Sequence, residues 1–175
     1  MSVYQNWPLP VAETRILIVD DIEDNRIVLK RGLERIGFQT TTCADGGSAV
    51  SMISSHVPDL VLLDWMMPGL SGIETVKAIR EHYDVNELPI IMCTARDEES
   101  SIVDAIDAGA NDYVQKPIKM PILLARMSAQ LMRKAGVAAM GAVAQDLEAT
   151  LAQRTRELFE ARSPRGSAQR IEEGS

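Results

Sequence analysis

The sequence predicts an α/β protein built on a doubly wound sheet of five parallel strands. Five short apolar or β-branched runs alternate with amphipathic stretches of helical period. Three of these runs are almost uniformly apolar, as expected for parallel strands that are buried on both faces. Repeated strand–helix alternation implies right-handed crossovers with helices on both sides of the sheet. The predicted strands comprise residues 15–19, 38–43, 59–63, 89–93 and 111–114.

Apolar residues at helical spacing follow each predicted strand. Leu29, Leu33 and Ile36 share one face of the first helix, and Gly37 marks its end. The later helices are indicated by Ala49, Met52 and Ile53; by Ile73, Val76 and Ile79; by Ile102, Ala105 and Ile106; and, after Pro117, by Leu123, Leu124, Met127 and Leu131. Each helix therefore has one apolar face with which to cover the sheet.

Composition excludes several classes of protein. The 175 residues are 46% hydrophobic and 25% charged, so the chain can bury a core without disulfide or metal support. A net charge of −7 argues against direct binding to nucleic acid or to an anionic membrane surface. There is no apolar run of the ~20 residues that a membrane helix needs, and residues 1–11 lack a signal-peptide pattern. We expect a soluble, cytoplasmic protein in which Cys43 and Cys93 are buried, reduced thiols.

Polar side chains follow four of the predicted strands at the point where each strand ends. Asp20 and Asp21 follow the first strand, Asp64 the third and Thr94 the fourth, while Lys116 lies just past the fifth. In a parallel sheet the carboxyl ends of the strands form the ligand-binding edge. Carboxylates that lie this close repel one another unless a cation joins them, and Mg²⁺ is the hard ion that prefers such ligands. The pattern predicts phosphoryl transfer onto a central aspartate, Asp64.

The motifs around these positions occur in a specific combination and order. They are Asp20-Asp21 after a hydrophobic strand, Asp64-Trp-Met-Met-Pro-Gly-Leu-Ser-Gly72, Thr94-Ala95 and Tyr113-Val-Gln-Lys-Pro117. Over about residues 15–133 the chain resembles the receiver domain of two-component response regulators. The resemblance implies a flavodoxin-like (βα)5 fold and the role of a phosphoacceptor and switch. It implies no enzyme activity beyond slow autodephosphorylation.

The resemblance also implies roles for the acidic residues. Asp64 would be phosphorylated by a partner histidine kinase or histidine phosphotransfer protein. Asp21, Asp64 and the backbone carbonyl of Met66 would ligate Mg²⁺ directly, and Asp20 would act mainly through water. Met66 and Arg96 fall at positions where the family varies, and they would tune the lifetime of the phosphoryl group.

The remaining motif residues would form the switch. By the same resemblance, Lys116 would hold one phosphoryl oxygen and Thr94 would move to hydrogen-bond another. Tyr113 would then swing inward into the space that Thr94 leaves. Ala95 is small and would leave the phosphoryl site accessible. The coupled shift would alter the surface formed by the fourth helix, the fifth strand and the fifth helix.

Beyond the receiver-like segment the sequence changes character. Residues 1–14 form an N-terminal arm, residues 134–162 a helical extension, and residues 163–175 a polar tail expected to be disordered. The extension carries a heptad seam that Arg154 interrupts, formed by Val137, Met140, Ala144, Leu147, Leu151 and Leu158. This seam predicts a homodimer or a linker helix.

Other interpretations stay open at this point. The chain is an N-terminal fragment of a larger regulator with its output domain beyond residue 175, or a receiver that acts in trans as a dimer. A Mg²⁺-dependent phosphohydrolase with an aspartate nucleophile is a different class, but it usually requires an acid two residues after the nucleophile, where this chain has Met66. A nucleotide-binding module is disfavoured because no Gly-rich loop follows the first strand.

Overall fold

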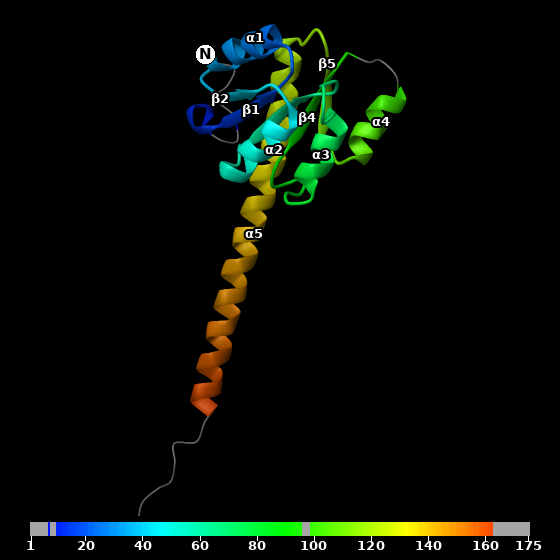
Figure 1. Cartoon of the computed structure of the whole chain (residues 1–175). Helices are drawn as coiled ribbons and strands as arrows, with labels where there is room; N and C mark the ends of the chain where they lie inside the picture. The colour runs from blue at the N-terminus through cyan, green and yellow to red at the C-terminus, as the bar shows by residue number, and fades with distance from the viewer. Residues whose placement is uncertain (1–6, 8–9, 96–98, 163–175) are drawn as a thin grey trace, which may run out of the picture. The chain divides into compact units, whose positions relative to one another are not determined.

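The protein folds around one five-stranded, all-parallel sheet (Figure 1). The computed structural model describes residue 7 and residues 10–95 and 99–162, with residues 99–101 and 160–162 described as backbone only. The strand order is β2-β1-β3-β4-β5, as expected for a doubly wound sheet. The strands are β1 (Arg15–Val19), β2 (Gln39–Cys43), β3 (Leu60–Asp64), β4 (Ile90–Thr94) and β5 (Asp112–Gln115). The predicted fold class is confirmed.

Helices cover both faces of the sheet. They are the short 3-10 turn η1 (Val11–Glu13) and the helices α1 (Glu23–Glu34), α2 (Gly46–Ser55), α3 (Gly72–Arg80), α4 (Glu99–Asp107) and α5 (Met120–Arg162). Because side chains alternate along a strand, Ile16 and Ile18 of β1 pack against α1 and α5. Leu17 and Val19 of the same strand face the opposite side, where α2, α3 and α4 supply the apolar partners.

The burial of the strands reflects their places in the sheet. β3 and β4 are buried at every residue, whereas the edge strand β2 is only partly covered. The sequence follows the same order, since β3 and β4 are mostly apolar and β2 reads Gln-Thr-Thr-Thr-Cys. A strand buried on both faces needs apolar residues throughout, and an edge strand does not.

The boundaries of every strand except β1 differ slightly from the predicted runs, and β3 and β4 each begin and end one residue later than predicted. Phe38 was expected to begin the second strand, but its N–H donates to the carbonyl of Leu33 at 3.2 Å. Together with the positive φ of Gly37 (115°), this hydrogen bond completes a C-terminal cap on α1. The fifth strand begins at Asp112, one residue later than predicted, and it extends to Gln115.

Local caps define the loops next to the carboxyl edge of the sheet. Asp45 caps α2 by accepting a hydrogen bond from the N–H of Ser48 at 2.8 Å. A reciprocal capping box between Ser71 and Glu74 begins α3. Gly72 lies so close to the end of β3 that a Cβ there would be 2.3 Å from the carbonyl oxygen of Asp64. The loop from β3 to α3 therefore requires glycine at this position.

The two cysteines lie on strands that are not neighbours. Cys43 ends β2 and Cys93 lies in β4, with β1 and β3 between them in the sheet, and both thiols are free. Three strand spacings separate them by about 14 Å, well beyond the reach of a disulfide.

The chain divides into two compact units, residues 1–137 and 138–175. In the first unit α5 buries Leu123, Met127 and Leu131 against the sheet. In the second unit the described residues are helical, and they continue the assignment of α5 to Arg162. Among the described helices, none combines the length and apolar character that spanning a membrane would require.

Candidate functional site

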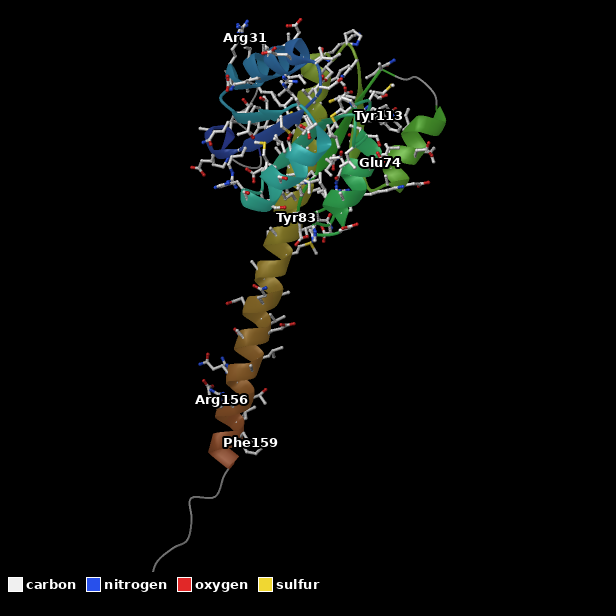
Figure 2. The ribbon with its side chains drawn as sticks, viewed as in Figure 1. Arg31, Glu74, Tyr83, Tyr113, Arg156 and Phe159 are labelled. Atoms are coloured by element: carbon white, nitrogen blue, oxygen red, sulfur yellow. The ribbon has the colours of Figure 1, made fainter. Side chains whose placement is uncertain are left out.

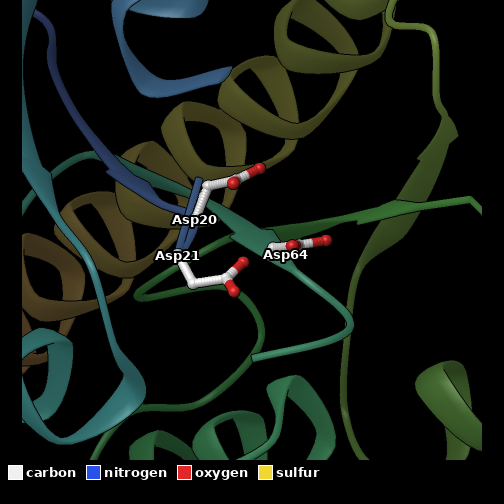
Figure 3. Close-up of side chains that lie close together, drawn as sticks. All are labelled: Asp20, Asp21 and Asp64. Carbon is white, nitrogen blue, oxygen red and sulfur yellow. The ribbon is translucent and has the colours of Figure 1, made fainter. Parts of the chain in front are cut away.

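The structure brings three carboxylates together at the carboxyl edge of the sheet (Figure 3). Asp20 follows β1, Asp21 is the next residue, and Asp64 ends β3. One carboxylate oxygen from each lies within 4.8 Å of the others. Asp20 and Asp64 are only 1% and 5% exposed, whereas Asp21 is exposed. Parallel neighbouring strands thus hold two buried acids side by side, with the third at their solvent side.

Lys116 is positioned between the two buried acids by the end of β5. Its Nζ lies 2.7 Å from Asp20 Oδ2 and 2.9 Å from Asp64 Oδ1. Its backbone N–H donates to the carbonyl of Thr94 at 2.8 Å, which continues the pairing of β5 with β4. The ammonium therefore neutralises part of the charge that the two carboxylates would otherwise leave buried.

Burial and charge act in opposite directions on these groups. Burial raises the pKa of Asp64, and the hydrogen bond and charge of Lys116 only partly offset this effect. For Lys116, burial disfavours the charged form, but Asp20 and Asp64 outweigh it and raise the pKa of the ammonium. The site thus holds Lys116 protonated and leaves Asp64 a stronger proton acceptor than an exposed aspartate.

The first turn of α1 adds contacts that the sequence pattern alone did not predict. Asn25 Nδ2 lies 3.1 Å from both carboxylate oxygens of Asp20, and the N–H of Ile22 donates to Asp20 Oδ1 at 2.9 Å. Arg26 Nη1 donates to the backbone carbonyls of Asp20 at 2.6 Å and Asp21 at 3.0 Å. With Lys116, four hydrogen bonds converge on the Asp20 carboxylate. These four hydrogen bonds orient the carboxylate, and the two from Arg26 hold the backbone of the loop after β1.

The acids open onto a surface cavity of about 710 Å³. Met66 is 60% exposed at its rim, and Ala95, exposed after the end of β4, also lines it. The full lining comprises Asp21, Ile22, Asn25, Asp64, Trp65, Met66, Met67, Pro68, Ser71, Ala95 and Lys116. A ligand of the size of a phosphoryl group therefore has access to Asp64. Arg96 lies outside the described residues.

Thr94 and Tyr113 lie on the neighbouring strands β4 and β5. Thr94 ends β4 and is 2% exposed, and Tyr113 is half-buried in β5 (Figure 2). Tyr113 pairs with Met92, two residues before Thr94, so the alternation of strand side chains places Thr94 and Tyr113 on the same face of the sheet. Arg126 of α5 lies over the Tyr113 ring, with its Cζ 5.2 Å from the ring centroid.

The predicted seam residues are exposed along the described part of the second unit and at its border. Their exposed fractions range from 45% at Val137 to 75% at Met140. Leu147, Leu151 and Leu158 are exposed in the same way, and Ala144 is exposed as well. Every side chain described from residue 138 to 159 is exposed, so exposure does not set the seam apart and only its heptad spacing does.

Comparison with known proteins agrees with this geometry. The family model described as the response regulator receiver domain matches residues 16–128. The phosphate regulon transcriptional regulatory protein PhoB of Rhizobium meliloti (strain 1021) is 44% identical over 119 residues, which are 68% of this chain and 52% of that protein. The chain thus spans about half the length of the curated relatives it matches.

Two solved structures extend the comparison. A two-component response regulator from Clostridium difficile is 33% identical, with a TM-score of 0.65 over 69% of this chain and 98% of that one. A fusion that contains a yeast Spc42 trimeric coiled coil is 26% identical, with a TM-score of 0.67 over 83% of this chain and 99% of that one. The motifs, the strand order and these matches agree, and the chain belongs to the family of response regulator receiver domains of two-component systems.

Proposed function

We propose that Asp64 is the phosphoacceptor of this receiver. A carboxylate oxygen of Asp64 attacks the phosphorus of a phosphohistidine on a histidine kinase or a histidine phosphotransfer protein. The P–N bond breaks, a P–O bond to Asp64 forms, and the leaving imidazole takes up a proton. The observation that carries the proposal is the direct contact of Lys116 with Asp64, beside the open cavity.

The donor set at this edge suits Mg²⁺. Asp21 and Asp64 supply hard oxygen ligands, and the backbone carbonyl of Met66 is the third protein ligand that we assign. Asp20 already accepts hydrogen bonds from Lys116 and Asn25, so we assign it a contact through water. Bound Mg²⁺ would neutralise charge on the transferring phosphoryl oxygens.

The chain's own residues then stabilise the product. Lys116 stays protonated between the acids, and its ammonium binds a phosphoryl oxygen as a point charge. Thr94 moves to donate its hydroxyl to a second oxygen, and Tyr113 turns into the vacated space. Ala95 leaves room for the phosphoryl group, while Met66 and Arg96 influence how fast water reaches it.

The test is labelling with acetyl phosphate in the presence of Mg²⁺, followed by intact mass. We expect the wild-type chain to gain the mass of one phosphoryl group, and Asp64→Asn to gain none. Asp59→Asn is a matched control, because Asp59 precedes the opposite end of the same strand and contacts Lys134. Equal labelling of Asp64→Asn and wild type would refute the assignment of Asp64. Steady hydrolysis of a small phosphate ester would instead support a phosphohydrolase.

We also propose that residues 134–162 pair with a second copy of the chain through the seam defined above. The apolar side chains at heptad spacing support this. The likeness over 83% of the chain to a fusion that contains a trimeric coiled coil supports association of the helix, but not the number of copies. If the chain is a fragment of a longer regulator, the same helix would also link the receiver to an output module. We assign the cytoplasm as its compartment, because its proposed phosphodonor, a histidine kinase, acts there.

Light scattering in solution tests the pairing. Leu147→Lys places a charge in the seam and is expected to give a monomer, because it buries an ammonium against apolar side chains. Ala149→Lys adds the same charge on the opposite side of the heptad and should keep the wild-type mass. A wild-type chain that is monomeric at high concentration would disprove the pairing, and a trimeric mass would replace the dimer with a trimer.

A further inference from the structure

Arg126 makes two contacts that converge on the start of β5. Its Nη1 forms a close ion pair with Asp112 Oδ1, and its Cζ lies 5.2 Å from the centre of the Tyr113 ring. Asp112 Oδ1 also accepts the backbone N–H of Tyr113 at 2.8 Å. One guanidinium from α5 is therefore held by one residue of β5 while it covers the aromatic ring of the next.

The ion pair limits where the guanidinium can go. Asp112 lies at the first position of β5, and its backbone is paired with Ile91 of β4. A planar guanidinium that is fixed by a carboxylate stacks on a ring without further loss of side-chain freedom. If Tyr113 moved toward Thr94 at the carboxyl end of β4, its ring would move away from a guanidinium that Asp112 holds at the start of β5.

The Tyr113 ring has the core on one side and a surface cavity on the other. Tyr113 and Arg126 both line a surface cavity of about 440 Å³, together with Lys119 and Ile122 of the same stretch of chain. On its inner side Tyr113 packs against the core cluster that includes Val19 and Met92. The Arg126 contact thus lies on the open side of the ring, where close packing does not enclose it.

We propose that Arg126 is a latch that holds Tyr113 in its resting position and so opposes the switch driven by phosphorylation. The proposal rests on the function proposed above for Asp64, Thr94 and Tyr113. A contact that exists in only one of two states stabilises that state and lowers the apparent affinity for any ligand that favours the other. Loss of the latch therefore makes the receiver easier to switch.

The first experiment measures the affinity for the phosphoryl mimic beryllofluoride in the presence of Mg²⁺. The chain has two tryptophans, so a Trp7→Phe background leaves Trp65, next to Asp64, as the only tryptophan reporter. We expect Arg126→Met to bind beryllofluoride about two- to fivefold more tightly than wild type, the factor that an ordinary exposed cation–π contact represents. Arg126→Lys keeps the charge and should lie between the two.

Two controls separate a latch from a general structural effect. Arg133 also lies on α5, where it donates to the carbonyl of Val85, and Arg133→Met should leave the affinity unchanged. In a Tyr113→Leu background the substitution Arg126→Met should have no effect, because the ring that it holds is gone. If Arg126→Met, in a chain that keeps Tyr113, binds beryllofluoride no more tightly than wild type does, the latch is refuted.

A second measurement works without any phosphoryl mimic and so separates the two proposals. Tyr4→Phe and Tyr83→Phe leave Tyr113 as the only tyrosine, which is then labelled as 3-fluorotyrosine. We expect Arg126→Met to shift its fluorine resonance in the unliganded chain, and Arg133→Met to leave it in place. An unchanged resonance refutes the latch even if beryllofluoride binds. If the wild-type chain does not respond to beryllofluoride, but Arg126→Met still shifts the resonance of the unliganded chain, the proposed function is contradicted and Arg126 remains the group that positions Tyr113.

Discussion

Lys116 Nζ lies 2.9 Å from Asp64 Oδ1, and this contact joins the end of β5 to the end of β3 across the intervening strand β4. The same ammonium contacts Asp20 at the end of β1. One cation thus links three of the five strands at the edge where the phosphoryl group is proposed to bind.

Mg²⁺ is expected to stabilise the wild-type chain and to have little effect on Asp21→Asn. Asp21 supplies the exposed carboxylate of the three-acid cluster, and Asn removes its charge. With Mg²⁺ at 100 times its dissociation constant, linkage stabilises the folded state by about 2.7 kcal/mol. Thermal unfolding should therefore show an increase in Tm of several degrees for wild type and a much smaller one for Asp21→Asn.

The control for this experiment is Asp24→Asn, which neutralises an exposed acid in the first turn of α1. It should respond to Mg²⁺ as wild type does. If Asp21→Asn and Asp24→Asn gained equal stability from Mg²⁺, the ion would be binding elsewhere.

Asp64→Asn is expected to be more stable than wild type at neutral pH. Burial raises the pKa of Asp64 in the folded state, so the folded chain holds this proton more tightly than the unfolded chain does. The resulting contribution to stability is present below the ordinary aspartate pKa and is lost as pH rises through the raised value. Asn is neutral at every pH and avoids this loss.

Urea unfolding in the presence of a chelator measures this difference. The free energy of unfolding of Asp64→Asn should exceed that of wild type at neutral pH, and the gap should narrow toward about pH 4, the ordinary aspartate pKa. An Asn variant that is less stable at neutral pH would show that the Lys116 contact outweighs burial.

Both cysteines are expected to react slowly with iodoacetamide. Burial raises the pKa of Cys93 to about 12 and that of Cys43 to about 11. Because the thiolate is the nucleophile, only a very small fraction of either side chain is reactive near pH 8. Peptide mass spectrometry should show slow labelling of Cys43 and almost none of Cys93 in the folded chain. Rapid labelling of both in urea is the control, and fast labelling of Cys93 without urea would contradict its burial.

Arg80 is expected to contribute to the stability of the fold but not to Mg²⁺ binding at the acidic cluster. It donates to the carbonyls of Gly109 at 2.8 Å and Leu88 at 2.9 Å and to Asn111 Oδ1 at 2.9 Å, all near the amino ends of β4 and β5. Burial lowers the pKa of Arg80 to about 10, so it remains charged at neutral pH. Arg80→Met removes a donor from each of these acceptors, although Asn111 Oδ1 keeps the N–H of Ile90 at 2.9 Å, and should cost about 2–4 kcal/mol.

Urea unfolding measures that loss of stability. Mg²⁺ binding, followed by Trp65 fluorescence, tests whether the substitution also affects the acidic cluster. The Mg²⁺ affinity should stay within error of wild type, because Arg80 acts at the opposite edge of the sheet. A large change in affinity would mean that the two edges are coupled through the strands.

The linear sequence was sufficient to predict the five strands and the position of the acids. Apolar runs bounded by helical patterns are local signals, and a parallel sheet places every strand end at a shared edge. Asp20, Asp21 and Asp64 therefore converge because of topology, and no detailed packing is needed to predict it.

The contacts between side chains of distant elements were decided only by the tertiary structure. Three examples are the hydrogen bond from Asn25 to Asp20, the contact of Arg126 with the Tyr113 ring and the hydrogen bond from Arg80 to Asn111. Each depends on the reach and direction of a polar side chain. Such contacts leave no periodic signal, because one residue at any of several nearby positions could make them. The sequence determined which groups meet at the edge of the sheet, and the packing of helices against that sheet decided how each group is held.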